Sequence, residues 1–188
     1  MRAFQPDQRC TRRGIGNAGF TLVELMTVVL ITGVLAMAGI ALIRGHLQVA
    51  KAIRAQAGIQ AIRNAEEGFR AQNGQYLDCS GRNARWYPML SPGKTKYEWH
   101  QVSHPDYANW SGLGVQGINT TQYGYLVNAG SPNVAFPTLQ TSTKPTFAAS
   151  PDHWYIIQVK GDLDGDGVPM LGLASSFNGE IYFEHEGE

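Results

Sequence analysis

The sequence predicts an α+β protein in which one long N-terminal α-helix packs on a small antiparallel β-sheet head. Three observations carry this prediction. An apolar run extends from Phe20 to Ile43, an amphipathic helical pattern continues from it to Asn73, and the remaining chain combines Gly, Pro, Asn and aromatic residues with short strand candidates. Helical periodicity followed by short segments between turn residues is typical of a helix that covers one face of a sheet.

Residues 1–19 form a short basic leader. Four arginines stand against one aspartate there, and the apolar run begins after the leader instead of inside it. A secretory signal peptide has the opposite layout, with its apolar stretch upstream of the cleavage site. The basic flank predicts that the N-terminus lies in the cytoplasm, because positive charge is retained on that side of a membrane.

Residues 20–43 form the predicted transmembrane helix. At about 1.5 Å per residue, this segment is long enough to span the hydrocarbon core of a bilayer. One carboxylate, Glu24, interrupts the apolar start of the run. A bare carboxylate in hydrocarbon is costly, so Glu24 is expected to act with a partner group. Gly33 and Gly39 weaken the helix and are its predicted points of flexibility.

The segment from Gly19 to Glu24, with the sequence GFTLVE, resembles the class III prepilin signal of type IV pilins and type II secretion pseudopilins. The resemblance implies cleavage after Gly19 by a prepilin peptidase, which also N-methylates Phe20. It implies that Glu24 faces the new Phe20 amine of a neighbouring subunit during assembly. An ion pair of this kind is tolerated in low dielectric only when it is closely matched.

The same resemblance implies a function, partners and a location. The subunit would wait in the inner membrane and then polymerise with itself into a helical filament for adhesion, motility, DNA uptake or secretion. The filament would be a surface pilus or a periplasmic pseudopilus. The other implied partners are the prepilin peptidase, an inner-membrane assembly platform with its ATPases, and a surface or DNA ligand. The subunit itself is not expected to be an enzyme.

Residues 44–73 form the predicted amphipathic half of the helix. Apolar side chains recur there at three- and four-residue spacing with basic residues around them. The predicted buried face comprises Leu47, Ala50, Ile53, Ala57, Ile59, Ile62, Glu66 and Phe69, surrounded by Lys51, Arg54, Arg63 and Arg70. Asn73 and Gly74 predict the end of the helix, because both suit the left-handed position that follows a helix.

Residues 74–188 form the predicted head. Segment 82–121 mixes Trp and Tyr with turn formers, so it is expected to be loop-rich and to contribute to a subunit-packing surface. The strand candidates are 123–128, 154–160, 170–175 and 180–184, each bounded by turn residues. Because Cys10 falls in the leader, Cys79 cannot form an intramolecular disulfide. We expect a small buried or surface thiol there, with an intersubunit disulfide as the alternative.

The loop between the second and third strand candidates reads DLDGDG, with carboxylates at Asp162, Asp164 and Asp166. Alternating carboxylates closed by Gly match the first half of a calcium loop. An EF-hand is excluded, because Leu173 stands where its last glutamate would be and strands flank the loop. Two interpretations stay open: a Ca²⁺ loop completed by the Val168 carbonyl, water or a distant carboxylate, and a simple solvated turn. No Lys or Arg follows Asp162, which favours a divalent cation.

Weaker signals accompany these motifs. His100, His104 and Asp106 have a spacing that zinc ligands could adopt, but no helix or cysteine pair accompanies them, so ordinary loop histidines are expected. Asn109 and Asn119 each begin a glycosylation-type tripeptide. After loss of the leader the side chains sum to 11 basic and 14 acidic residues, which argues against a nucleic-acid footprint over the whole surface.

Alternative functions remain at this stage. Within the family, the chain could be a type II secretion pseudopilin or a minor pilin instead of the main building block. A membrane-anchored calcium-dependent binding module, in which no polymer forms, would be indifferent to Glu24. An anchored enzyme would need a site assembled only in the fold, since no nucleophilic triad motif, phosphate loop or paired catalytic carboxylates stand in the sequence.

Overall fold

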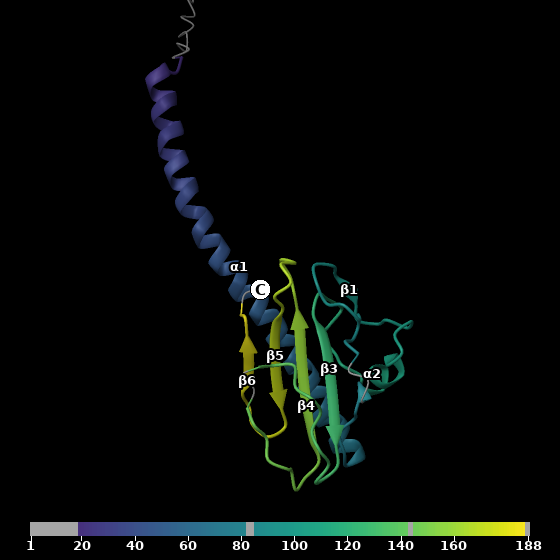
Figure 1. The fold of residues 1–188 in the computed structure, drawn as a ribbon. Coiled ribbons are helices and arrows are strands. Elements are labelled where there is room, and N and C mark those ends of the chain that lie inside the picture. The colour runs from purple at the N-terminus through teal and green to yellow at the C-terminus, as the bar shows by residue number, and fades with distance from the viewer. Residues whose placement is uncertain (1–18, 82–84, 143–144, 187–188) are drawn as a thin grey trace, which may run out of the picture. The chain divides into compact units, whose positions relative to one another are not determined.

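The computed structural model describes residues 19–81, 85–142 and 145–186. Within these ranges the chain forms two helices and six strands (Figure 1). The elements are α1 (Leu22–Asn73), β1 (Tyr97–Glu98), α2 (Tyr107–Leu113), β2 (Thr120–Thr121), β3 (Gly124–Gly130), β4 (Trp154–Gly161), β5 (Met170–Ser175) and β6 (Ile181–Glu184). They fall into two compact units, up to Leu42 and from Ile43 onward, and α1 contributes to both. The α+β class is confirmed.

Helix α1 ends where the sequence predicts. Gly74 has a φ of 75°, and its N–H donates to the carbonyl of Arg70 at 2.7 Å, so the last turn is closed by a left-handed residue. The helix begins at Leu22, two residues after Phe20, and continues without a break through the glycines of its apolar half.

Four strands form one antiparallel sheet in the order β3-β4-β5-β6, so each strand pairs with the one that follows it in the chain. The register sets Val127 opposite Ile157, and Ile157 opposite Ala174. All four predicted strands are confirmed to within two residues at each end. Their turn residues and short apolar runs are local signals, which a sequence shows directly.

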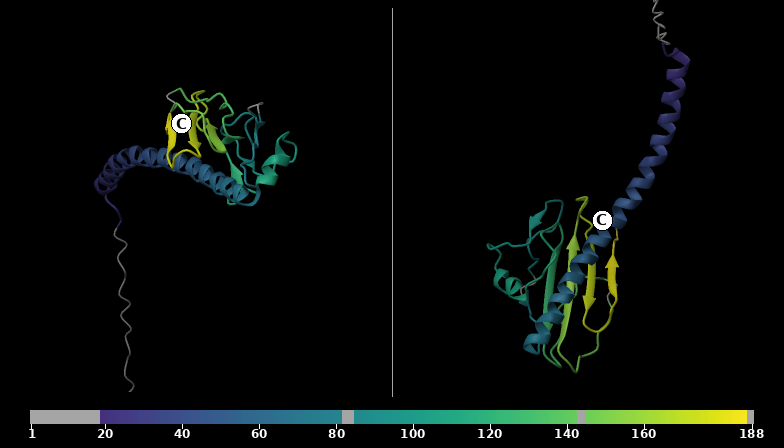
Figure 2. Two further views of the ribbon diagram at one scale, coloured as in Figure 1. Left: turned by 90° about the horizontal axis from the view of Figure 1, so that it is seen from below. Right: turned by 180° about the vertical axis from the view of Figure 1, so that it is seen from behind.

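One face of this sheet packs on the part of α1 that follows Ile43, as the view from behind in Figure 2 shows. Ala55, Ile59 and Ile62 are fully buried there. Because strand side chains alternate between faces, every second residue of β3 and β4 enters this core. The predicted helix face is partly wrong, since Ile53 is 57 % exposed and Ala57 is exposed as well.

Gly58 lets β3 approach α1 closely. A Cβ atom at this position would lie 2.0 Å from the hydroxyl oxygen of Tyr125, which is far inside contact distance. Tyr125 is fully buried, and burial raises the pKa of its phenol. The missing side chain of Gly58 therefore sets the distance between the helix and the sheet.

The opposite face of the sheet carries a second, smaller core. The connection between β3 and β4 crosses this face and contributes Phe136, Leu139 and Phe147. They pack on Trp154, Ile156 and Leu173. Both faces of the sheet are therefore covered, one by α1 and the other by a long connection.

The segment expected to be loop-rich is more ordered than predicted. It contains α2 and the short β1-β2 pair, and three of its six aromatic residues are buried. Tyr87 stacks on Trp110 with 4.7 Å between ring centroids, and Trp99 meets Trp110 edge-on at 5.4 Å. All three rings are buried, and the contribution of this segment to a subunit-packing surface stays a prediction. With 7 residues, α2 is too short to show a helical period in the sequence.

Gly58→Ala is expected to lower the free energy of unfolding by about 1–3 kcal/mol, because the new methyl group overlaps the Tyr125 hydroxyl. The matched control is Gly68→Ala on the exposed side of α1, where an added Cβ meets no atom within 4 Å. The control should gain up to about 1 kcal/mol, since Ala favours helix over Gly. Urea unfolding of a fragment that begins at Ile43 measures both, and equal effects would contradict the close approach.

Candidate functional site

Thr21 and Glu24 form a reciprocal cap at the start of α1. The N–H and the hydroxyl of Thr21 donate to Glu24 Oε2 at 3.3 and 3.2 Å, and the N–H of Glu24 donates to Thr21 Oγ1 at 3.2 Å. This is a capping box, and the spacing T-x-x-E is its sequence signature, which our sequence analysis missed. The carboxylate also faces the positive end of the helix dipole. Glu24 therefore has a partner in its own chain.

The segment that follows is long and apolar enough to cross a membrane. It covers Leu22–Gly39, 18 residues with a mean hydropathy of 2.1, and none of it is buried. The threonine hydroxyls of this segment are hydrogen-bonded within the helix. Thr27 and Thr32 donate to the backbone carbonyls of the residues four positions earlier, at 2.5 and 2.8 Å. Polar groups satisfied within the helix are compatible with a hydrocarbon environment.

The predicted cleavage site lies just before the helix. Gly19 and Phe20 are non-helical and exposed, with 81 % of the Phe20 side chain accessible. Exposed chain outside regular structure is the form that proteases cut most readily. The leader residues 1–18 lie outside the described residues, so Gly19 is the first position of this motif that the structure places.

The acidic loop joins β4 to β5. One carboxylate oxygen from each of Asp162, Asp164 and Asp166 lies within 4.8 Å of the other two. Asp162 also accepts the N–H groups of Gly165 at 2.6 Å and Gly167 at 3.2 Å. Both glycines have positive φ, 71° and 92°, which lets the backbone fold around the carboxylate. The structure therefore brings the three predicted ligands together.

These donors agree with Ca²⁺ in chemical type. Ca²⁺ takes about six to eight oxygen ligands, so carbonyls or water would have to complete the three carboxylates. The N–H of Val168 donates to Asp166 at 2.7 Å, which holds the predicted carbonyl donor next to the loop. A positively charged side chain lies close to the loop, because Lys94 Nζ is 2.9 Å from the position that a Cβ atom at Gly165 would take. Lys94 therefore offsets part of the negative charge.

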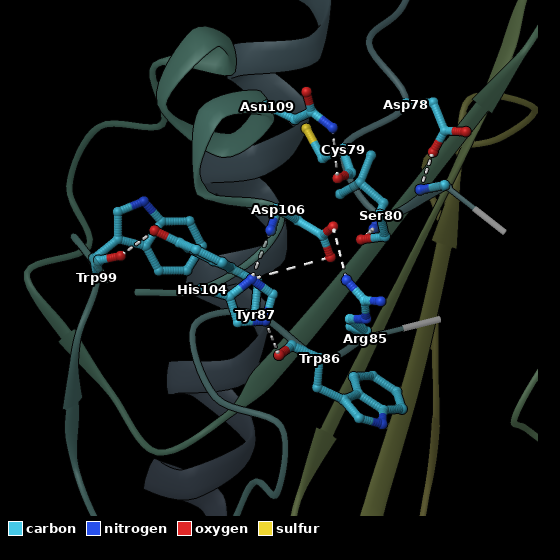
Figure 3. A network of polar contacts seen from close by, with 12 residues as sticks. Asp78, Cys79, Ser80, Arg85, Trp86, Tyr87, Trp99, His104, Asp106 and Asn109 are labelled. Carbon is cyan, nitrogen blue, oxygen red and sulfur yellow. Dashed lines mark hydrogen bonds and ion pairs between the residues drawn. The ribbon is translucent and has the colours of Figure 1, made fainter. Parts of the chain in front are cut away.

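His104 is a structural histidine (Figure 3). Its Nε2 lies 3.1 Å from the carbonyl oxygen of Trp86, and its Nδ1 accepts the N–H of Asp106 at 3.1 Å. A neutral imidazole has one donor and one acceptor, so both nitrogens are used. His100 is exposed, and within the described ranges the acidic loop is the one metal-competent group. The zinc spacing is therefore not brought together in space.

Arg63, one of the basic residues expected around the buried face of α1, is itself buried with 9 % exposure. Its guanidinium donates to four carbonyls of the β5-β6 turn at 2.9–3.3 Å: Ser175, Asn178, Gly179 and Glu180. The planar fork of Arg suits several acceptors at once. Arg63 thus ties the C-terminal hairpin to α1. Arg63 stands four residues after Ile59 and so lies on the same apolar stripe of the helix, and this spacing is the sequence signal that indicates its burial.

Glu66 lies on the same buried stripe with no exposed surface. Its Oε2 accepts the N–H of Leu77 at 3.0 Å, whereas Oε1 has no partner among the described residues. Burial raises the pKa of this carboxyl to about 7. Cys79 is also buried, and burial raises the pKa of its thiol, so an intersubunit disulfide at Cys79 is disfavoured.

Residues 16–40 match the family model of the prokaryotic N-terminal methylation motif. This segment includes the predicted cleavage site, the capping box and the whole apolar span Leu22–Gly39. No curated protein and no solved structure matches the chain.

Glu66→Gln is expected to remove a pH dependence of stability. The folded pKa is about 7 and the reference value is 4.5, so the folded state binds more protons between these pH values. The stabilising contribution is therefore complete below about pH 4.5 and is lost as the pH rises through 7, on the order of 2–3 kcal/mol. Gln keeps an acceptor for Leu77 and cannot ionise.

Urea unfolding between pH 4 and pH 8 measures this difference. The exposed neighbour Glu67, changed to Gln, serves as the control and should leave the pH dependence in place. Parallel pH profiles for the wild type and Glu66→Gln would contradict the assignment.

Proposed function

Because residues 16–40 carry the class III prepilin signal of type IV pilins and pseudopilins, we propose that this chain is the structural subunit of a type IV pilus-like helical filament. Cleavage after Gly19 releases the mature subunit in the inner membrane, with its N-terminus on the cytoplasmic side. N-methylated Phe20 and the apolar half of α1 then enter the polymer. Prepilin peptidase, an assembly platform and its ATPases are the partners of this route.

The observation that carries the proposal is a carboxylate at the start of an unburied apolar helix. In the single subunit, Glu24 accepts hydrogen bonds from Thr21, which stabilise the carboxylate without neutralising it. Cleavage after Gly19 creates an amine at Phe20. In a polymer the amine of one subunit would pair with Glu24 of a neighbour, and two charges withdrawn from water are tolerated best when they meet each other.

Two alternatives share the same signal and differ in abundance and location. A major pilin starting at N-methylated Phe20 would dominate sheared surface filaments, whereas a minor pilin would be present in trace amounts. A type II secretion pseudopilin would be processed equally and remain in the envelope. Intact mass and N-terminal sequence of the sheared and membrane fractions distinguish these, and an uncut chain from Met1 would contradict the whole proposal.

Ca²⁺ binding at the acidic loop is a second, independent proposal. The supporting observation is the set of three carboxylate oxygens within 4.8 Å of one another, next to the Val168 backbone. A bound cation would stabilise the β4-β5 turn near the end of the sheet. If the protein were instead an anchored calcium-dependent binding module, this site would matter while Glu24 would not.

Glu24→Ala is expected to leave cleavage after Gly19 intact and to reduce filament yield by about tenfold or more, because an unpaired partner charge would remain in low dielectric. Thr21→Ala is the matched control: it removes the cap and keeps the carboxylate, so assembly should persist. Quantification of sheared filaments and of processed subunit in the membrane checks both. A wild-type filament yield in Glu24→Ala would contradict the proposed pairing of Glu24 with the Phe20 amine of a neighbour.

Replacing Asp162, Asp164 and Asp166 together by Asn is expected to abolish stabilisation by Ca²⁺. At a concentration of about 100 times the dissociation constant, a ligand specific to the folded state stabilises by about 2.7 kcal/mol. The melting temperature of the wild type should therefore rise by several degrees in calcium over chelator. Asp152→Asn, an exposed aspartate outside the loop, should keep this rise. Equal melting curves of the wild type in calcium and in chelator would contradict the proposed Ca²⁺ site.

A further inference from the structure

A positively charged pocket lies beside α1 on the side of β3. It has a volume of ≈ 280 Å³ and is lined by Arg54, Lys96 and residues of the chain leading into β3. No Asp or Glu lines it, and neither cation forms an ion pair with a described residue. Thr120 and Gln122 add a hydroxyl and an amide to the same wall. We call it the basic pocket, and its chemistry suits a carboxylate or another anion.

A groove lies beside the same stretch of α1 on the side of β6. It has a volume of ≈ 610 Å³, and its walls include Val49, Ile53, Phe183 and Glu186. Val49 and Ile53 are 60 % and 57 % exposed, so apolar helix surface is left uncovered. We call this the β6 groove. An exposed apolar strip with a charged rim is typical of a protein interface.

The two surfaces belong to opposite edges of one sheet. The strand order places β3 at one edge and β6 at the other, and consecutive residues Ile53 and Arg54 line different hollows. Glu186 lines the β6 groove, whereas Arg54 and Lys96 line the basic pocket, so the two surfaces carry groups of opposite charge. Arg63, which also lines the groove, donates to carbonyls of its own chain. Complementary patches on different sides of one molecule join copies head to tail without closing.

Among the acidic residues near β6, Glu186 is the best placed to act between copies. It is exposed, it lines the groove, and it has no hydrogen bond or ion pair with a described residue. Glu184 instead accepts from the backbone N–H and the hydroxyl of Ser142, at 2.9 and 3.2 Å. Glu180 accepts from the Tyr182 hydroxyl at 2.5 Å.

We propose that the β6 groove of one subunit docks on the basic pocket of the next, with Glu186 of one copy paired to Arg54 and Lys96 of the other. The occupant of both surfaces is a second copy of this chain, and Val49 and Ile53 are covered by it. The inference rests on the proposed filament and adds to it a contact between heads. Such a contact sets the rotation from one subunit to the next, which packing of uniformly apolar helices specifies poorly.

A charge exchange in the full-length protein tests the pairing. Arg54→Glu combined with Lys96→Glu should lower sheared filament yield by about tenfold or more, because like charges would then face each other. Adding Glu186→Lys should restore most of the yield, which a merely structural role would not do. Lys160→Glu is the control, since Lys160 lies on the face of β4 that alternation turns away from α1.

A crosslink provides a second readout. Lys96→Cys and Glu186→Cys in one chain should give dimers and a ladder of higher multimers from oxidised filaments, and neither single variant should give the ladder. The remaining Cys79 of the mature chain has no exposed surface and does not interfere.

The outcomes separate this inference from the proposed function. Wild-type filaments with no ladder and no loss of yield on charge reversal would overturn the head contact and leave the polymer intact. An absence of filaments from the wild type would overturn the proposed function itself. If the charge-reversed filaments formed normally and lost only retention of DNA, the basic pocket would be a polyanion site and the contact between copies would be wrong.

Discussion

The packing of one stripe of α1 on the inner face of the sheet is the contact on which the rest of the head depends. Ala55, Ile59 and Ile62 lose all their exposed surface there, and buried apolar area stabilises by about 25 cal/mol per Å². Gly58 sets how closely β3 can approach, and Arg63 reaches from the same stripe to the last turn. The basic pocket and the β6 groove exist because a single helix is too narrow to cover a four-stranded sheet.

Charged groups in apolar surroundings are stabilised in three different ways in this chain. Glu24 accepts hydrogen bonds at the positive end of its own helix. The two terminal nitrogens of Arg63 donate to four carbonyls of one turn, whereas its Nε has no partner among the described residues. Glu66 has one backbone donor and no cationic partner among the described residues, and burial raises its pKa until the neutral form is accessible near pH 7. Of the three, only Glu24 lies where another subunit could reach it.

The two halves of α1 have different requirements for burial. From Leu22 to Gly39 the helix is apolar on all sides and has nothing packed on it, so lipid or other helices must cover it. From Ala55 to Glu66 it has one buried stripe and an exposed back. The first half therefore has no preferred side for packing, whereas the second half has Arg54 and Lys96 beside one flank and Glu186 beside the other.

The motif around Glu24, the apolar span, the helix stop at Gly74 and the four strands could all be predicted from the sequence, because each depends on residues close together in the chain. The tertiary structure sets which side of α1 is buried, because the sheet selects the stripe that its own side chains can contact. It also placed Arg63 inside, through a contact with Gly179 that spans 116 positions, and it gathered Tyr87, Trp99 and Trp110 into a core. Contacts between distant residues leave no periodic signal in a single sequence.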